Sequence, residues 1–515
     1  MTVTLSRGKK NLWCGIAATV SALLLWAAYP PHGETLAVLV ALVPMLVVAR
    51  LSSLRRSLIT FFLFGLIFWV LSLSWMPAII KNNGPWPLVI LGWFALSAAC
   101  AGYLALYGFC VAWLWRWRER RRTVAMFSVA CIFGESVLWA FFEYLRATLF
   151  TGFAWNFLGT AFASMPSFAT PARFGGVYLV SALVVLLNGV FATLMMRVFA
   201  PVFGVGGDET GRSRFAARIV QIAETGLPLA FILACLCAGN RMVRSEATGD
   251  PEPINLRVAL VQRNAPCCFK PGKRENAYEA FGKLLDAVAA AKPDLVVLAE
   301  SAMAEFGPVR SFRAQDVVRG FLKRSGATAL IAGGDDVVED RTYNAAAFYV
   351  DDGKGGVGPL SVYHKQHLVP FGEYIPFDKW ITPLQKLSPV GVSLHSGAPT
   401  LFEIVASGGR SLKVAPLICY EDTDPRLAAQ AKRMGADMIV LVTNDSWFSE
   451  SAEAEAHAAQ AVLRAIETGL PIVRVGNSGV TGVIRPDGST TWLSDGAGKP
   501  LVDAPGVMVE TIAVK

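Results

Sequence analysis

The sequence predicts a multi-span α-helical membrane domain followed by an α/β domain, and three observations support this fold class. The chain has 515 residues, enough for two or more domains, and 54% of them are hydrophobic, which is too many for an ordinary soluble protein. The apolar excess lies before about residue 240, whereas the rest alternates short apolar stretches with amphipathic ones. We therefore place a transmembrane domain at 1–241 and a second domain at 252–515.

The first domain contains about seven apolar segments that approach the roughly 20 residues needed to cross a bilayer. The first follows basic residues as a signal peptide would, but the later segments favour an uncleaved anchor. The last is the weakest, because its clean apolar core covers only 227–238. The predicted spans are 11–29, 34–49, 58–80, 87–115, 124–142, 174–199 and 219–238.

Basic residues indicate the orientation of these spans, because Lys and Arg stay on the cytoplasmic side. They precede the first span and recur after the second, fourth and sixth, which explains the net charge of +8 without nucleic acid. We predict a bacterial inner-membrane protein with a cytoplasmic N-terminus and a periplasmic second domain; one span more or fewer would reverse the side of that domain. The groups counted after the second and fourth spans are Arg50, Arg55, Arg56 and Arg116, Arg118, Arg120, Arg121, Arg122.

A few polar and aromatic residues in this domain are candidates for lipid contact. Glu135 is costly in lipid, so we expect it to face other helices. Glu143 and Arg146 are i,i+3 partners that either anchor a helix end or bind substrate. Phe153 and Trp155 follow, as an interfacial belt or as a lipid-docking surface.

The second domain alternates predicted strands with predicted amphipathic helices, a pattern that indicates sheets covered by helices. The expected strands are 256–262, 294–299, 327–332, 345–350, 412–418, 438–443 and 472–475, with a further strand on each side of a turn at 486–488. The expected helices are 274–290, 314–324, 424–433 and 452–467.

Several polar groups follow predicted strands, where the functional groups of α/β sheets gather. Glu300, Cys419 and Asn444–Asp445 each come directly after an apolar run. Taken singly, each is also explained as an ordinary turn residue or a buried thiol. Together with Lys365, which lies beside a loop, they suggest acyl transfer through a cysteine nucleophile at a membrane surface.

The sequence shows no metal or disulfide pattern. Six of the nine cysteines lie in apolar runs of the first domain, and the vicinal Cys267 and Cys268 are more simply an incidental surface pair than a redox switch. His367 and His457 lack close-spaced ligand partners, so we expect ordinary polar contacts. We expect neither a metal nor a cofactor.

Four motifs resemble those of the nitrilase superfamily, whose members use a Glu-Lys-Cys triad. They are Asp294–Glu300, His364–Glu373, Ile418–Glu421 and Asn444–Phe448. Preceded by membrane spans, and with Glu143–Arg146, Thr151–Trp155, Arg464–Glu467 and Gly476–Thr481 also matching, the chain is similar to the apolipoprotein N-acyltransferase family. The resemblance implies an α-β-β-α sandwich for the second domain.

Carried over residue by residue, the resemblance implies a general base at Glu300, an oxyanion stabiliser at Lys365 and a nucleophile at Cys419. It assigns supporting positions to Glu373, Tyr420 and Glu421, and Trp447 is a further candidate for lipid contact. The implied reaction moves an acyl chain from a membrane phospholipid to a diacylated apolipoprotein through a Cys419 thioester, in a monomer resting in the lipid bilayer.

The chain departs from the family pattern at three places. It has Leu298-Ala299-Glu300 where Trp-Pro-Glu is usual, and Arg263 where Gly is usual. Family members return to the membrane after the catalytic domain, whereas the apolar stretch at 507–514 is too short to span. These departures leave the triad intact.

Two other functions stay open at this point. A membrane-tethered amidase or nitrilase would use the same three residues with water as the acceptor. A transporter or receptor would fit seven spans, but few ionisable residues lie within them and no pair of broken helices marks a midplane site.

Overall fold

The computed structural model describes residues 6–82, 84–120, 126–199, 214–248, 252–265, 277–350, 357–375, 393–406 and 409–515. The chain divides into two compact units. The first comprises Met1–Met76 and Pro87–Arg244, and the second comprises Pro77–Trp86 and Ser245–Lys515. The second unit therefore includes the short helix α4 (Ala78–Lys81), which lies in the middle of the predicted membrane domain.

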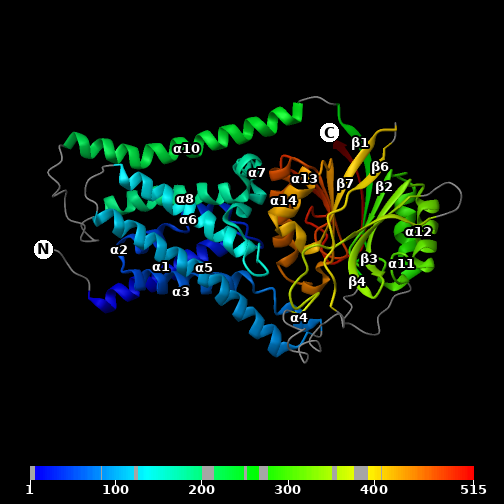
Figure 1. Cartoon of the computed structure of the whole chain (residues 1–515), viewed down its shortest axis with the longest axis horizontal. Helices are drawn as coiled ribbons and strands as arrows, with labels where there is room; N and C mark the ends of the chain where they lie inside the picture. Colours follow the sequence, from blue (N-terminus) through cyan, green and yellow to red (C-terminus); the bar gives the residue numbers. More distant parts are fainter. Residues whose placement is uncertain are drawn as a thin grey trace. The chain divides into compact units, whose positions relative to one another are not determined.

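The first unit is helical (Figure 1). Six of its helices in the described part of the chain are long and apolar enough to cross a membrane. They are α1 (Arg7–Ala27), α3 (Leu54–Ser72), α5 (Trp86–Arg120), α6 (Phe127–Thr148), α8 (Ala172–Val198) and α10 (Arg214–Thr248). Short elements complete the unit: η1 (Thr35–Leu39), α2 (Val43–Leu51), η2 (Leu158–Ser164) and α7 (Pro166–Ala169).

The predicted span 34–49 is divided between two shorter helices, η1 and α2. Pro44 lies in the first turn of α2, a position at which the missing proline N–H is tolerated. A single helix that continued from residue 35 would lose a backbone hydrogen bond at Pro44. The other six predicted ranges each overlap one of the long helices, but the range 58–80 runs past the end of α3 at Ser72 into α4 of the second unit. Because the side of the second domain depends on the number of crossings, the orientation stays a prediction.

The first unit, hereafter the membrane unit, contains a buried ion pair between Arg50 and Glu135. Arg50 Nη2 lies 2.6 Å from Glu135 Oε2, and the Trp115 indole N–H donates to Glu135 Oε1 at 2.6 Å. The expectation that Glu135 faces other helices is confirmed. Arg50, counted above among cytoplasmic loop residues, is instead buried at the end of α2, because a carboxylate without a cation would be too costly inside this unit.

The second unit contains two six-stranded sheets. The first has the order β12-β1-β2-β3-β4-β5 and the second the order β11-β10-β9-β8-β7-β6. The strands of the first sheet are β1 (Ile254–Gln262), β2 (Leu295–Leu298), β3 (Ala329–Val338), β4 (Arg341–Val350), β5 (Pro359–His364) and β12 (Gly506–Val514). Those of the second are β6 (Phe402–Val405), β7 (Ser411–Ile418), β8 (Met438–Thr443), β9 (Ile472–Gly476), β10 (Gly482–Ile484) and β11 (Thr490–Trp492).

Helices cover the outer face of each sheet, so the predicted α-β-β-α layering is confirmed (Figure 1). Alternate residues of β2 show why: Leu295 and Val297 pack into the core between the sheets, whereas Val296 and Leu298 pack under the helices. On the first sheet lie α11 (Ala277–Ala289) and α12 (Phe312–Ser325); on the second lie α13 (Pro425–Arg433) and α14 (Glu453–Thr468). The remaining 3-10 turns are η3 (Ala304–Phe306), η5 (Cys419–Thr423) and η6 (Asp445–Phe448).

Parallel pairing brings the candidate residues to common edges. Strand β2 runs parallel to β1 and β3, and β7 runs parallel to β8, so the carboxyl ends of neighbouring strands lie side by side. Three strands were not predicted: β5, β6 and β12. The apolar stretch at 507–514 forms β12, an edge strand antiparallel to β1.

Candidate active site

Glu300, Lys365 and Glu373 form one buried polar cluster that Asn344 holds together. Lys365 Nζ lies 2.8 Å from Glu373 Oε1 and 3.9 Å from Glu300 Oε1. Asn344 Nδ2 donates to Oε1 of Glu300 and to Oε1 of Glu373, each at 2.7 Å. The second oxygen of Glu373 accepts from the Val369 N–H at 2.8 Å. A single cation thus lies between two carboxylates whose positions are set by one amide.

Strand ends supply these groups. Glu300 comes two residues after β2, Lys365 directly after β5, and Asn344 from within β4. The Lys365 N–H donates to the Asn344 carbonyl at 2.9 Å, so the lysine and the asparagine are joined through the backbone as well.

Cys419 begins η5 directly after β7, with a φ of 51°. Few residues other than glycine adopt this left-handed region, and such strain persists only where the surroundings enforce it. The enforcing group is Glu421, whose Oε2 accepts from the Ile418 N–H at 2.8 Å. Cys419 is a half-buried residue at the start of this turn, directly after the backbone N–H that Glu421 holds.

Glu421 also ties this turn to the loop that follows β5. Its Oε1 accepts from the N–H groups of Gln366 and His367 at 2.7 and 3.0 Å, and both of its oxygens lie 2.9 Å from the Tyr363 hydroxyl. Its carboxylate is fully buried. Glu421 therefore fixes the distance between the segment carrying Lys365 and the segment carrying Cys419.

Burial and neighbouring charges shift the pKa values of the three candidate catalytic groups. Burial, and to a lesser degree Glu373, raise the pKa of Glu300 to about 7 despite the opposing effect of Lys365. Burial and the Glu300 carboxylate hold the pKa of Cys419 well above its usual value, and Lys365 lowers it only in part. For Lys365 burial lowers the pKa, but Glu373, Cys419 and Glu300 outweigh burial and raise it.

These directions define what the cluster can do chemically. The resting site holds a protonated thiol, an ammonium ion and a carboxyl group that titrates near neutrality. A carboxylate with a pKa of about 7 suits a general base at neutral pH.

Two residues beside Glu300 support its turn. At Gly333 of β3 an added Cβ would lie 2.5 Å from the Glu300 Cα, so only glycine allows this approach. Arg263, one of the departures from the family pattern, bonds to Glu305 Oε2 at 2.6 Å. The arginine thus anchors the segment that follows the predicted base.

Tyr420, the remaining supporting candidate, belongs to the cysteine turn (η5, Cys419–Thr423), and Trp447 was predicted as a lipid contact. The Tyr420 ring meets the His367 ring edge to face with centroids 5.5 Å apart. Trp447 lies in η6, and its carbonyl accepts from Asn82 Nδ2 at 2.8 Å. Asn82 is itself buried and belongs to the second unit.

The candidates in the membrane unit make structural contacts. Arg146 Nη1 donates to the carbonyls of Phe153 and Trp155, each at 2.7 Å, and Glu143 Oε1 accepts from the Trp139 indole and the Leu158 N–H. The Trp155 side chain is buried. These contacts support the alternative in which the pair fixes the helix end and the loop after it; a substrate role stays a prediction.

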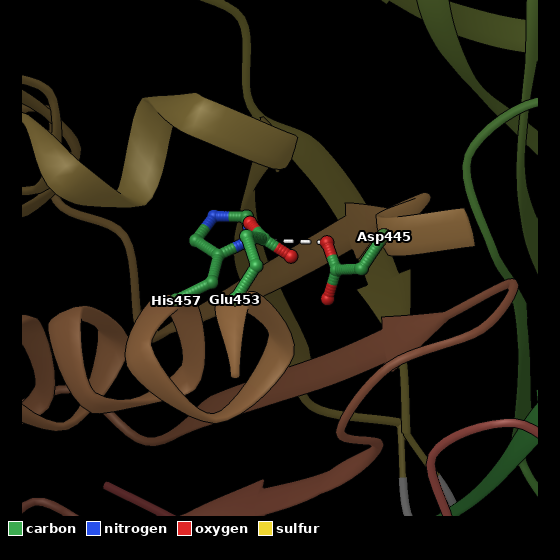
Figure 2. A group of neighbouring side chains, drawn as sticks. All are labelled: Asp445, Glu453 and His457. Carbon is green, nitrogen blue, oxygen red and sulfur yellow. Dashed lines mark hydrogen bonds and ion pairs between the residues drawn. The ribbon is translucent and has the colours of Figure 1, made fainter. Parts of the chain in front are cut away.

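The two histidines considered as metal ligands make polar contacts, as expected. His367 Nδ1 lies 3.4 Å from Asp424 Oδ2. The ring of His457 lies near the carboxylates of Asp445 and Glu453 (Figure 2), with Nδ1 at 3.0 and 3.6 Å from them. Cys267 and Cys268 lie outside the described residues.

Sequence reasoning missed Asn344, Gly333 and the carboxylate of Asp422. The Gly333-Gly334 pair within a strand was an available signal of close backbone approach. Asn344 and Asp422 carried no such signal, because their roles depend on partners 44 and 35 residues away in the chain.

Comparison with known proteins agrees with this architecture. Residues 21–190 match the apolipoprotein N-acyltransferase N-terminal domain, and residues 257–502 match the carbon-nitrogen hydrolase family. The apolipoprotein N-acyltransferase of Ralstonia nicotianae is 30% identical over 443 residues, which cover 83% of this chain and 74% of that protein. That of Geobacter metallireducens is 28% identical over 480 residues, covering 92% and 85%.

Among solved structures, an amidase from Nesterenkonia sp. is similar to 51% of this chain and 92% of its own, with 19% identity and a TM-score of 0.36. Family models match both halves of this chain, and the N-acyltransferase relatives align with most of its length. The chain belongs to the apolipoprotein N-acyltransferase family.

Proposed function

We propose that this membrane protein is an acyltransferase that moves an acyl chain from a membrane phospholipid to the α-amino group of an apolipoprotein's N-terminal S-diacylglyceryl cysteine. The observations that support the proposal are that Lys365 Nζ lies 3.9 Å from Glu300 Oε1 and that Glu421 bonds both to Ile418, just before Cys419, and to Gln366, just after Lys365. The other half of the chain contains membrane-length helices. The names of the relatives support N-acylation of an apolipoprotein, and the phospholipid donor is part of the proposal.

In the first step Cys419 is acylated. Glu300 accepts the thiol proton as the sulfur attacks the ester carbonyl carbon of the phospholipid, forming a tetrahedral intermediate with a negative oxygen. Lys365 balances that charge, and the Tyr420 N–H is the expected second donor; one such donor is typically worth about 2.7–4 kcal/mol. The carbon–oxygen bond then breaks, the lysophospholipid oxygen takes the proton from Glu300, and a thioester remains.

In the second step the lipoprotein amine attacks the thioester carbonyl. Glu300 accepts a proton from the nitrogen, the carbon–sulfur bond breaks, and the thiol is restored when the proton returns to sulfur. Ester, thioester and amide follow one another without ATP, metal or coenzyme A. Because two substrates use one nucleophile in turn, the kinetics should be ping-pong.

The helical unit has a physical reason in this scheme. A diacylated donor leaves a bilayer only at a cost of about 0.8 kcal/mol per buried CH₂ group, so the site has to meet the lipid at the membrane. We propose a bacterial inner-membrane location with the catalytic domain on the periplasmic side, as seven crossings from a cytoplasmic N-terminus would require, and a monomeric enzyme.

Intact-mass analysis after incubation with a phospholipid of defined acyl chains tests the proposal. We expect one added acyl mass on the Cys419 peptide, stable until a diacylated lipopeptide is supplied, and then N-acylated lipopeptide. Cys419→Ala should abolish both events, whereas Cys110→Ala, a thiol of the membrane unit, should change neither.

The hydrolytic alternative is distinguished in the same experiment. Rapid release of fatty acid in the absence of lipopeptide, or turnover of a small amide by the wild-type enzyme, would show that the protein is a hydrolase and not an acyltransferase. Full activity in Cys419→Ala would rule out the covalent route.

A further inference from the structure

His457 lies in a buried charge network next to the cysteine turn. It projects from α14 with Glu453 toward Asp445 (Figure 2), and its side chain is 2% exposed. Its Nε2 lies 2.9 Å from Asp422 Oδ1, and its Nδ1 lies 3.0 Å from Asp445 Oδ1. The first carboxylate belongs to η5 and the second to η6. One imidazole thus connects three elements.

The geometry determines the charge on this ring. A neutral imidazole has one N–H and one lone pair, whereas both nitrogens of His457 face carboxylate oxygens that only accept hydrogen bonds. A neutral ring would direct its lone pair at one of the two carboxylates. Burial lowers the pKa of His457, but Asp422 and Asp445 outweigh burial and raise it well above the usual value. The ring is therefore an imidazolium.

The remaining charges balance. Arg474 Nη2 lies 3.0 Å from Asp445 Oδ2, so two cations face Asp422 and Asp445. Burial and Asp445 raise the pKa of Glu453, which favours its neutral, protonated form. The network is electrically neutral in this state.

The same contacts argue against a metal site. Ligand atoms of Asp445, Glu453 and His457 lie within 4.8 Å of one another, which is close enough for a shared ion. In this arrangement both nitrogens of His457 are already bonded to carboxylate oxygens, and Asp445 already pairs with the Arg474 guanidinium. The cluster is thus better suited to ion pairing than to metal binding.

The network reaches the nucleophile through two routes. Asp422 belongs to the five-residue turn that begins with Cys419. Thr443 donates to Asp445 Oδ1 at 2.8 Å, and its hydroxyl is close enough to the Cys419 thiol to lower the pKa of that thiol. A shift of the imidazolium would therefore move the turn that carries the sulfur and the hydroxyl that contacts it.

We propose that His457 is a positioning residue: as an imidazolium bonded to Asp422 and Asp445, it fixes the Cys419 turn against the Thr443–Asp445 segment. The thiol is thereby held in line with Glu300 and Lys365. The inference deepens the proposed function and rests on Cys419 as its nucleophile.

His457→Gln in the full-length protein tests the role, because glutamine keeps polarity but lacks the charge and the two opposed donors. We expect single-turnover acylation by phospholipid to slow by about 10- to 100-fold, since small displacements of a reacting group have effects of that size. The phospholipid KM should stay within about twofold. His457→Lys, which restores a cation with several donors, should recover about tenfold of the loss. The same substitution at an exposed histidine, His395→Gln, is the matched control.

A second readout separates this inference from the proposed function. Alkylation of Cys419 by iodoacetamide, followed on the Cys419 peptide at several pH values, should slow in His457→Gln and recover in His457→Lys. If phospholipid never acylates the wild-type protein, the proposed function fails, but this comparison still decides the role of His457.

The inference would be overturned if His457→Gln were acylated and alkylated at the wild-type rates. So would a lysine variant as impaired as the glutamine variant, or one equivalent of bound metal in the purified protein. If His457→Gln does not fold, Asp422→Asn takes its place, because it removes the charge of one partner at constant size. We expect a several-fold loss of both rates there; unchanged rates would refute the proposal.

Discussion

The Nδ2 atom of Asn344 lies 2.7 Å from Oε1 of Glu300, the residue proposed as the general base. The same atom bonds to Glu373, which in turn bonds to Lys365. One side-chain amide therefore sets the positions of both the proposed proton acceptor and Glu373, the ion-pair partner of Lys365.

Replacing Asn344 with leucine should raise the pKa of Glu300 above its value of about 7, because the hydrogen bond from the amide favours the carboxylate. Acylation should slow by about 3- to 10-fold at pH 7, and the midpoint of its pH dependence should move upward. Single-turnover acylation from pH 5.5 to 9 measures both effects. A slower reaction with an unchanged midpoint would assign Asn344 to another role.

In the wild-type enzyme the acylation rate should rise with pH through about 7, because Glu300 accepts a proton only when it is ionised. Glu300→Gln should lower the rate at every pH by about 10²- to 10⁴-fold and abolish this inflection. A titration that persists near pH 7 in the glutamine variant would mean that another group is the base.

The same pKa predicts that Glu300 costs stability at alkaline pH. The pKa of Glu300 is raised to about 7 in the folded state. Its contribution to the free energy of unfolding is therefore fully present below the pKa that Glu300 has in the unfolded chain, and it is lost as pH rises through 7. Glu300→Gln should therefore be more stable than the wild type at pH 8, by about 3 kcal/mol. Thermal unfolding at several pH values checks this, and the difference should shrink toward pH 5.

Glu421→Gln should disturb the cysteine turn although it changes little in size. Its amide nitrogen would face N–H donors, at Ile418 on one side or at Gln366 and His367 on the other. Leaving buried donors unsatisfied costs about 1–3 kcal/mol of unfolding free energy. Alkylation of Cys419 should change as well, and a variant with normal stability and normal thiol reactivity would contradict this account.

In the membrane unit, Arg50→Met should lower the free energy of unfolding by about 3–5 kcal/mol, because it leaves the Glu135 carboxylate buried without a cation. The double variant Arg50→Met, Glu135→Leu should recover most of that loss. Unfolding in detergent, followed by tryptophan fluorescence, measures both. Equal losses in the single and the double variant would show that packing, not charge, dominates at this position.

Local patterns were sufficient to predict most of the architecture. Apolar runs identified the long helices, and strands such as β8, buried at every position, were visible as continuous apolar segments. The span at 34–49 was misread because hydropathy does not register the start of a new helix at Pro44. Strands β5 and β6 were missed because five of the six residues of β5 and two of the four residues of β6 are partly exposed or exposed, so their apolar signal is weak.

The sequence alone determined the order of the two domains and the identity of the candidate base, lysine and thiol, since each follows a recognisable strand or lies in a recognisable motif. Only the tertiary structure decided what surrounds them: Asn344 between the two glutamates, Glu421 across two loops, and His457 between Asp422 and Asp445. Periodicity is local and can be read along the chain. Hydrogen bonds and desolvation depend on distances between segments that only folding brings together.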